Sequence, residues 1–210
     1  MTTNLEKEPV LTDSLPIMES FYTIQGEGVH SGKAAYFIRV GGCDVGCVWC
    51  DVKESWEAAK HPKTKISQLL KEVQTTKTEI VVITGGEPLM YDMDQLTETL
   101  QRAGYQTNIE TSGAYPISGH WDWVCFSPKK FKAPHESIYS VADELKVIIY
   151  NKSDFKFAEE HAANVTESCH LLLQPEWSVQ EKMIPLIVDY VKSNPKWKIS
   201  LQTHKYMGVE

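Results

Sequence analysis

Seven short strand-like runs, most of them nearly continuously apolar, constrain the fold of this chain more than any other feature of its sequence. Such runs are typical of parallel β-strands that are buried on both faces. Between several of them, apolar residues recur at helical spacing, so strands and helices alternate along the chain. The predicted strands cover residues 35–40, 79–84, 105–110, 123–127, 144–150, 170–173 and 198–202, and helices are predicted near residues 66–73, 96–103, 153–163 and 179–193.

The order of these elements predicts an α/β fold with a parallel sheet. A closed barrel of eight strand–helix units takes about 250 residues, whereas this chain has 210. The third and fourth predicted strands are separated by only about a dozen residues, which leaves little room for a helix. We therefore predict a partial, TIM-like parallel β-barrel of about six to seven strands with reduced helices. We assign it to one domain, residues 18–210, after a loose N-terminal arm at residues 1–17.

Charge and hydropathy exclude several classes of partner. The net charge is −7, whereas nucleic-acid phosphates bind to basic surfaces. Lys129, Lys130 and Lys132 form a local basic cluster, which we interpret as a solvated rim or a contact for a small anion. No apolar run approaches the roughly 18 residues of a membrane helix, and the polar, acidic start is unlike a secretory signal. We predict a cytoplasmic protein that binds neither nucleic acid nor membranes.

Three of the five cysteines, Cys43, Cys47 and Cys50, fall within eight residues, directly after the first predicted strand. Cys125 and Cys169 stand alone in apolar, strand-like runs and are predicted to be inert core residues. A reducing cytosol makes a disulfide framework a poor interpretation of these five residues. The cluster of three therefore points to metal chemistry.

Three thiolates held in one turn repel one another unless a strong cation binds them. Zinc is the simplest candidate, but structural zinc sites use four ligands and no fourth Cys or His lies nearby in the sequence. Iron–sulfur clusters also usually take four cysteines. Three ligands to a four-iron cluster leave one iron open to bind something else. We favour a catalytic cluster, with structural zinc and chance spacing as the alternatives.

Polar motifs follow most of the predicted strands. Residues 84–88 read Thr-Gly-Gly-Glu-Pro, where two glycines let the backbone approach a ligand and Glu87 could accept a hydrogen bond from an ammonium. By itself this motif could be a simple turn into a helix. At the end of the third strand, Glu110 and Ser112 could hold a ribose. Further polar stretches follow the next strands at residues 127–129, 174–175 and 203–205.

These positions share one edge of the predicted sheet. The carboxyl ends of the strands carry the active sites of parallel α/β barrels, so the motifs predict an active site there. Lys146 is different, because it lies inside the fifth predicted strand. A lysine in such a run either extends to the end of the barrel or is paired inside it, and the sequence leaves both open.

The cysteine spacing, with Trp49 just before the third cysteine, resembles the signature of the radical S-adenosylmethionine superfamily. The resemblance implies the radical SAM fold and a [4Fe-4S] cluster held by the catalytic, metal-binding Cys43, Cys47 and Cys50. It also implies that S-adenosylmethionine chelates the open iron and that an electron from the cluster releases a 5′-deoxyadenosyl radical. The loop with Glu87 would then bind the methionyl amino group.

Residues 25–28, Gln-Gly-Glu-Gly, make the resemblance more specific when they are combined with Arg39 and with Asp51 after the third cysteine. From about Met18 to the end, the chain closely resembles the 7-carboxy-7-deazaguanine synthase family (QueE). The resemblance implies a carbon–nitrogen lyase of queuosine and 7-deazapurine biosynthesis. Such an enzyme contracts the ring of 6-carboxy-5,6,7,8-tetrahydropterin to 7-carboxy-7-deazaguanine and releases ammonia.

The resemblance also implies roles for individual residues and a set of partners. Family members are homodimers, and an electron donor such as a flavodoxin or ferredoxin would reduce the cluster. Substrate would be bound by Ile24, Gln25, Gly26, Glu27, Arg39, Thr84 and the C-terminal Glu210. S-adenosylmethionine would be bound by Trp49, Cys50, Asp51, Gly86, Glu87, Glu110, Ser112, Ser127, Pro128, Lys129 and Gln174.

The chain departs from the family pattern at Val52. The family usually has Thr or Ser there, and its hydroxyl helps to hold Mg²⁺ beside the substrate carboxylate. Valine cannot ligate a cation that requires oxygen, so we predict a weakened or altered magnesium requirement. Two other functions stay open from the sequence: an activase that installs a glycyl radical on a partner protein, and a non-catalytic zinc-binding module.

Overall fold

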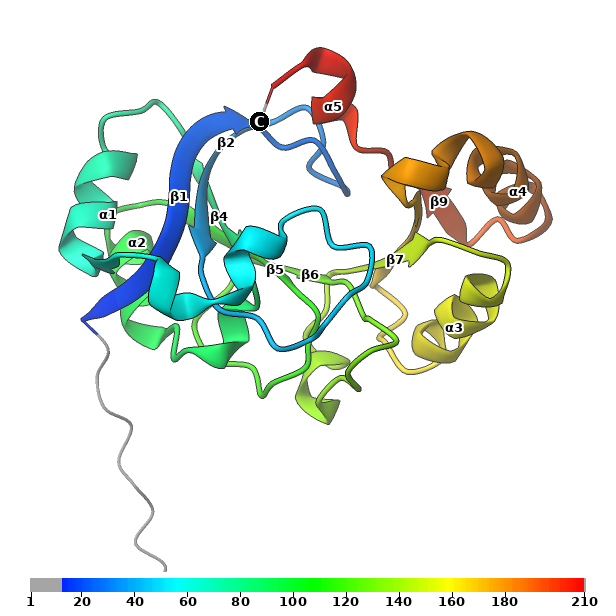
Figure 1. Cartoon of the computed structure of the whole chain (residues 1–210), viewed down its shortest axis with the longest axis horizontal. Helices are drawn as coiled ribbons and strands as arrows, with labels where there is room; N and C mark the ends of the chain where they lie inside the picture. The colour runs from blue at the N-terminus through cyan, green and yellow to red at the C-terminus, as the bar shows by residue number, and fades with distance from the viewer. Residues whose placement is uncertain (1–12, 210) are drawn as a thin grey trace, which may run out of the picture.

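Seven consecutive strands of the sheet, β2 and β4 to β9, run parallel in the computed structural model, which describes residues 13–209 (Figure 1). Within that range the sheet has nine strands in the order β3-β1-β2-β4-β5-β6-β7-β8-β9. β1 pairs antiparallel with both β2 and β3. The two edge strands, β3 and β9, do not pair with each other, so the barrel stays open. This arrangement confirms the predicted partial barrel.

The elements have the following bounds. The strands are β1 (Ser14–Ile24), β2 (Ala34–Val40), β3 (Lys63–Lys65), β4 (Ile80–Gly85), β5 (Gln106–Thr111), β6 (Trp123–Phe126), β7 (Glu144–Ile149), β8 (His170–Pro175) and β9 (Trp197–Ile199). The α-helices are α1 (Ile66–Val73), α2 (Asp94–Arg102), α3 (Ser153–Ala162), α4 (Gln180–Ser193) and α5 (Thr203–Met207). Short 3-10 helices are η1 (Lys53–Trp56), η2 (Ala58–Lys60), η3 (Pro88–Met90), η4 (Glu136–Ile138) and η5 (Trp177–Val179).

All seven predicted strands are present, and the two that the sequence did not predict are the antiparallel pair β1 and β3. Pro16 argues against a strand in the sequence, because proline has no N–H to donate. In the structure its carbonyl accepts from Gly41 N (2.8 Å), and the strand continues through the bulge between Ile17 and Glu19. β1 therefore begins at Ser14, inside the segment predicted as an arm; residues 1–12 lie outside the described residues.

The four predicted helices are confirmed as α1 to α4. As predicted, helices are missing where the segment between two strands is short. No α-helix connects β5 to β6, and only η4 lies between β6 and β7. In the part of the chain that the structure describes, no helix is long and apolar enough to cross a membrane.

Strand β7 illustrates how the sheet separates an apolar outer layer from a polar interior. Leu145, Val147 and Ile149 are buried in the core beneath α3 and α4. Because successive strand residues point to opposite faces, Lys146 and Ile148 face the inside of the barrel, where both line a cavity. The strand period thus places charged groups inside the sheet and apolar groups against the helices.

Candidate active site

The interior of the barrel contains a cavity of about 1390 Å³, including its open mouth. Residues at the carboxyl ends of β2, β4, β5, β6 and β8 line it, in agreement with the edge predicted from the sequence. Of the predicted site residues, Pro128 does not line the cavity and Glu210 lies outside the described residues. The others do: Ile24, Gln25, Gly26, Glu27, Arg39, Cys43, Cys47, Trp49, Cys50, Asp51, Thr84, Gly86, Glu87, Glu110, Ser112, Ser127, Lys129 and Gln174.

The three clustered cysteines share one wall of this cavity, in the loop that follows β2. Burial raises the pKa of the Cys43 thiol, and burial together with the neighbouring cysteines raises that of Cys47 to about 11 despite Lys129 nearby. Without a bound cation the Cys43 and Cys47 thiols are therefore protonated at neutral pH. Metal binding displaces such protons.

The donor geometry argues against the zinc alternative. Among the residues described, no group of three or more Cys, His, Asp or Glu side chains is gathered closely enough to hold a single metal ion. A tetrahedral zinc site requires four such donors around one atom. Cysteine thiolates hold a four-iron cluster from outside, and the three cysteines that line this cavity could hold one while leaving one iron open.

An ion pair joins the cysteine loop to the segments that follow β5 and β6. Asp44 accepts from Lys132 Nζ at 2.8 and 2.7 Å and from the Tyr115 hydroxyl at 2.5 Å. The Lys132 ammonium also lies 4.0 Å from the centre of the Tyr115 ring. Part of the basic cluster seen in the sequence therefore positions this loop.

Gly86 lets the loop after β4 approach the cysteine loop. A Cβ at this position would lie 2.1 Å from the carbonyl oxygen of Gly42, so only glycine fits. The next residue, Glu87, donates its backbone N–H to the same oxygen (2.8 Å). The two glycine-containing loops thus meet directly beside the cysteines.

The side chain of Glu87 is turned into the protein. It is 1% exposed and accepts from Leu89 N (3.1 Å), the Thr111 hydroxyl (2.5 Å), Ser112 N (2.9 Å) and the Ser112 hydroxyl. A carboxylate offers about four acceptor sites, so these donors occupy them. The predicted contact to an ammonium does not follow from this geometry; the carboxylate instead fixes the loop after β4 to the end of β5.

Lys129 closes the cavity next to Trp49. Its Nζ donates to the carbonyl (2.5 Å) and hydroxyl (2.6 Å) of Ser127 and lies 6.0 Å from the centre of the Trp49 ring. Burial lowers the pKa of this lysine, which Cys47 and other acidic groups partly oppose.

The Gln-Gly-Glu-Gly loop reaches the cavity from the opposite end of the barrel. Because β1 is antiparallel to β2, Ile24 pairs with Ala34 at the amino end of β2. The loop then crosses beneath the cavity, where Val29 N donates to the Glu144 carboxylate at the start of β7 (2.8 Å). Its polar residues therefore form the floor of a site whose other residues lie at the carboxyl edge.

On this floor the side chains make a connected network. Gln25 Nε2 donates to Glu110 (2.9 Å), and Lys146 Nζ lies 2.5 Å from Glu27 and 3.4 Å from Glu110. Gln202 Nε2 donates to the other carboxylate oxygen of Glu27 (2.8 Å). Lys146 is 3% exposed, so it is paired inside the barrel, one of the two arrangements that the sequence left open.

Burial by itself would raise the pKa of Glu27. The charge of Lys146, with hydrogen bonds from Lys146, Gln174 and Gln202, outweighs burial and lowers that pKa to about 2. Glu27 is therefore ionised at neutral pH although only 14% of its side chain is exposed.

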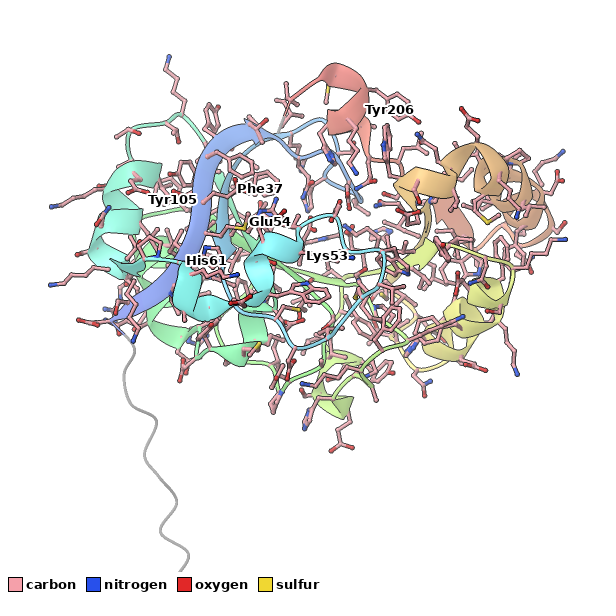
Figure 2. The ribbon with its side chains drawn as sticks, viewed as in Figure 1. Phe37, Lys53, Glu54, His61, Tyr105 and Tyr206 are labelled. Atoms are coloured by element: carbon pink, nitrogen blue, oxygen red, sulfur yellow. The ribbon has the colours of Figure 1, made fainter. Side chains whose placement is uncertain are left out.

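Arg39 lies on β2 with part of its guanidinium free for a ligand. Its Nε donates to Glu19 at 2.6 Å, and its side chain is 19% exposed. Phe37, which is labelled in Figure 2, lies two residues earlier on the same face and stacks on Phe21 with ring centres 5.5 Å apart. The cavity thus combines a cation with a flat apolar wall.

Several cavity residues were not predicted from the sequence as site residues. The strand period could have found Phe37, because it shares a face with Arg39. Gln202 and His204 come into the cavity because Thr203 N donates to Gly26 O (2.9 Å), a contact between distant segments that no local pattern reveals. The other unpredicted residues are Phe21, Val45, Val52, Trp56, Gly85, Thr111, Lys146, Ile148, Pro175, Glu176 and Trp177.

Comparisons with known proteins identify the family of this chain. The family model described as "Radical SAM superfamily" matches residues 37–157. The chain is 61% identical to a 7-carboxy-7-deazaguanine synthase of Flavobacterium psychrophilum, over 94% of this chain and 93% of that protein. It is 48% identical to one of Synechocystis sp., over 95% and 96% of the two chains.

A solved structure has the same fold. The structure titled "Crystal structure of QueE from Escherichia coli" superposes with a TM-score of 0.83 at 32% identity, covering 91% of this chain and 95% of that one. The solved structure agrees with the open barrel described above. The chain therefore belongs to the radical SAM superfamily and, within it, to the 7-carboxy-7-deazaguanine synthase family.

Proposed function

We propose that this chain is a radical SAM carbon–nitrogen lyase that converts 6-carboxy-5,6,7,8-tetrahydropterin to 7-carboxy-7-deazaguanine with loss of ammonia, for queuosine or other 7-deazapurines. One observation carries the proposal: the three cysteines line the same cavity as Arg39 and the Gln-Gly-Glu-Gly loop. A site for cluster chemistry and a site for a small, anionic, flat molecule are thus one site. Relatives at 61% and 48% identity bear the name of this synthase.

Cys43, Cys47 and Cys50 would hold the [4Fe-4S] cluster. When bound and reduced, the cluster supplies the electron that cleaves S-adenosylmethionine and so gives the radical that takes a hydrogen atom from substrate. The cofactor would lie along the wall formed by Trp49, Asp51, Gly86, Ser112, Ser127, Lys129 and Gln174. Polar groups from several loops suit its amino acid and ribose parts.

The substrate would occupy the side of the cavity that contains Arg39. The guanidinium nitrogens that Glu19 leaves free offer two parallel N–H donors, which match a carboxylate. The stacked Phe21 and Phe37 rings provide an apolar surface for a flat ring system. Ionised Glu27 is an acceptor for ring N–H groups. Tight positioning of this kind also limits attack of a radical on other C–H bonds.

The remaining assignments are proposals of the same kind. We propose a cytoplasmic homodimer that is reduced by a flavodoxin or ferredoxin, with Glu210 near the substrate. We also propose that Mg²⁺ is needed less than in relatives that carry a hydroxyl at position 52, because Val52 lines the cavity without an oxygen ligand.

The test is an anaerobic conversion assay. Reconstituted protein is incubated with dithionite, S-adenosylmethionine and the carboxytetrahydropterin, and products are identified by mass spectrometry. We expect 7-carboxy-7-deazaguanine together with ammonia, and none from a Cys50→Ala variant. A purified protein that contains zinc and lacks iron and sulfide would support the alternative, a non-catalytic zinc-binding module. Cleavage of S-adenosylmethionine without any change in the pterin would contradict the proposed substrate.

A further inference from the structure

Lys146 is the most deeply buried charged side chain of the cavity floor, with 3% of its surface exposed. It reaches two carboxylates that come from distant parts of the chain: Glu27 at 2.5 Å, from the loop after β1, and Glu110 at 3.4 Å, from β5. All three residues line the cavity. No sequence motif assigns a role to this lysine.

The surroundings of Lys146 make it the main positive charge on the floor. The ionisable groups that face it from neighbouring elements are Glu27, Glu110, Cys125 and Glu144, and Lys129 lies close enough to repel it. His204 faces the same two carboxylates, Glu27 and Glu110. Acidic groups therefore outnumber basic ones, and burial of several carboxylates requires a compensating cation.

The two carboxylates keep capacity for a ligand after binding Lys146. Glu27 Oε2 lies against Lys146 and Oε1 accepts from Gln202 (2.8 Å), and Gln174 is a further donor to this carboxylate. Glu110 Oε1 accepts from Gln25 (2.9 Å). Each carboxylate oxygen can accept two hydrogen bonds. Both side chains are thus fixed in direction and still able to accept from N–H groups in the cavity.

We propose that Lys146 is a positioning residue for the substrate: it holds and orients Glu27 and Glu110 as a pair of acceptors for the N–H edge of the bound ring. This gives Glu110 a role toward the substrate in place of the cofactor role expected from the sequence. The inference rests on the proposed function and names the group that sets substrate affinity. Lys146 does not need to touch substrate. Its effect passes through the two carboxylates that it holds.

The charge of Lys146 has a consequence for pH. Without it, only the hydrogen bonds from Gln174 and Gln202 oppose the effect of burial, which raises the pKa of Glu27. A neutral carboxyl group accepts N–H groups less strongly. Substrate affinity then improves as the pH rises and the carboxyl ionises again. With Lys146 present, Glu27 stays ionised across the whole neutral range.

The experiment measures KM and kcat for the carboxytetrahydropterin in the wild type and in Lys146→Met, between about pH 6.5 and pH 8.5. Cleavage of S-adenosylmethionine without pterin is measured in parallel, because it reports on the cluster and its cofactor alone. Lys146→Gln is a second neutral variant that keeps a hydrogen-bond donor in case methionine prevents folding. Lys146→Arg keeps the charge. Lys130→Met is the matched control, because Lys130 pairs with Asp154 away from the cavity (2.5 Å).

We expect the neutral variants to raise KM by about tenfold or more at pH 7.5, with kcat and pterin-free cleavage within about threefold of wild type. Their KM falls as the pH rises, whereas that of wild type, Lys146→Arg and the control stays flat. A folded neutral variant with the KM and pH profile of wild type would overturn the role of Lys146 and leave the proposed function standing. A wild type that cleaves S-adenosylmethionine but leaves the pterin unchanged would overturn the proposed function, and the inference with it.

Discussion

Glu87 accepts a hydrogen bond from the backbone N–H of Ser112 at 2.9 Å and a second one from its hydroxyl group. Together with the bond from Thr111 (2.5 Å), this contact joins the loop after β4 to the end of β5. The buried carboxylate therefore sets the relative position of two loops that line the cofactor wall.

Glu87→Gln tests this contact. The amide places N–H groups against the hydroxyl and N–H donors of Thr111 and Ser112, so buried donors lose their acceptor. We expect the free energy of unfolding to fall by about 1–3 kcal/mol, with loss of pterin-free cleavage of S-adenosylmethionine. Denaturant titration and 5′-deoxyadenosine release measure the two effects. Glu98→Gln, on the exposed face of α2, is the control, and equal behaviour of the two variants would count against the role of Glu87.

Arg39→Lys tests how the substrate carboxylate is bound. Lysine keeps the charge but loses the fork of two parallel donors and the Nε bond to Glu19. We expect KM to rise by about ten- to hundredfold, because a hydrogen bond to a charged group is lost, while pterin-free cleavage is unchanged. Arg102→Lys, an exposed arginine paired with Glu98, serves as control. An unaltered KM would exclude Arg39 as the carboxylate ligand.

The low pKa of Glu27 predicts a pH-dependent stability. Its pKa is about 2 in the folded chain against an ordinary value of 4.5, so the folded state binds this proton less readily than the unfolded state. The resulting stabilisation is present above about pH 4.5 and is lost as the pH falls toward 2. Urea unfolding from pH 5 downward should be less pH-dependent in Glu27→Gln than in wild type. The control is Glu57→Gln, at an exposed ion pair, whose stability should depend on pH as that of wild type does. If the stability of Glu27→Gln showed the same pH dependence as wild type and the control, the low pKa of Glu27 would be refuted.

Val52→Thr tests the magnesium prediction. Val52 lines the cavity, and the nearby Ser55 hydroxyl offers no replacement because it is buried and donates to the Val52 carbonyl (2.7 Å). A threonine hydroxyl restores an oxygen ligand, so we expect Mg²⁺ to stimulate the steady-state rate more in the variant. Val48→Thr adds a hydroxyl at a position 66% exposed in the same loop and should change nothing. If Mg²⁺ stimulated Val52→Thr no more than wild type, the proposed effect of Val52 on the magnesium requirement would be contradicted.

Much of the fold could be predicted because the information is local. Most of the seven parallel strands are nearly continuous apolar runs, and the helices α1 to α4 show their apolar spacing within single segments. β1 and β3 could not be predicted in the same way, since Pro16 interrupts the first and the second has only three residues. Both strands depend on a partner that lies far away in the sequence.

For the site, too, local patterns were predictable and contacts between distant segments were not. Motifs at strand ends identified many of the polar cavity residues, because parallel strands bring their carboxyl ends together. The partner of Lys146 was not predictable, since Glu27 lies 119 residues earlier and enters from the other end of the barrel. Nor did the sequence reveal that Glu87 faces Ser112, because only the folded loops bring these residues together.

The most direct test of the account is the electron paramagnetic resonance spectrum of the reduced, anaerobically reconstituted protein, recorded with and without S-adenosylmethionine. Three cysteine ligands and one open iron predict about four irons and four sulfides per chain, and a cluster signal that changes when S-adenosylmethionine is added. Bound zinc without a cluster, or a cluster signal that S-adenosylmethionine leaves unchanged, would contradict it.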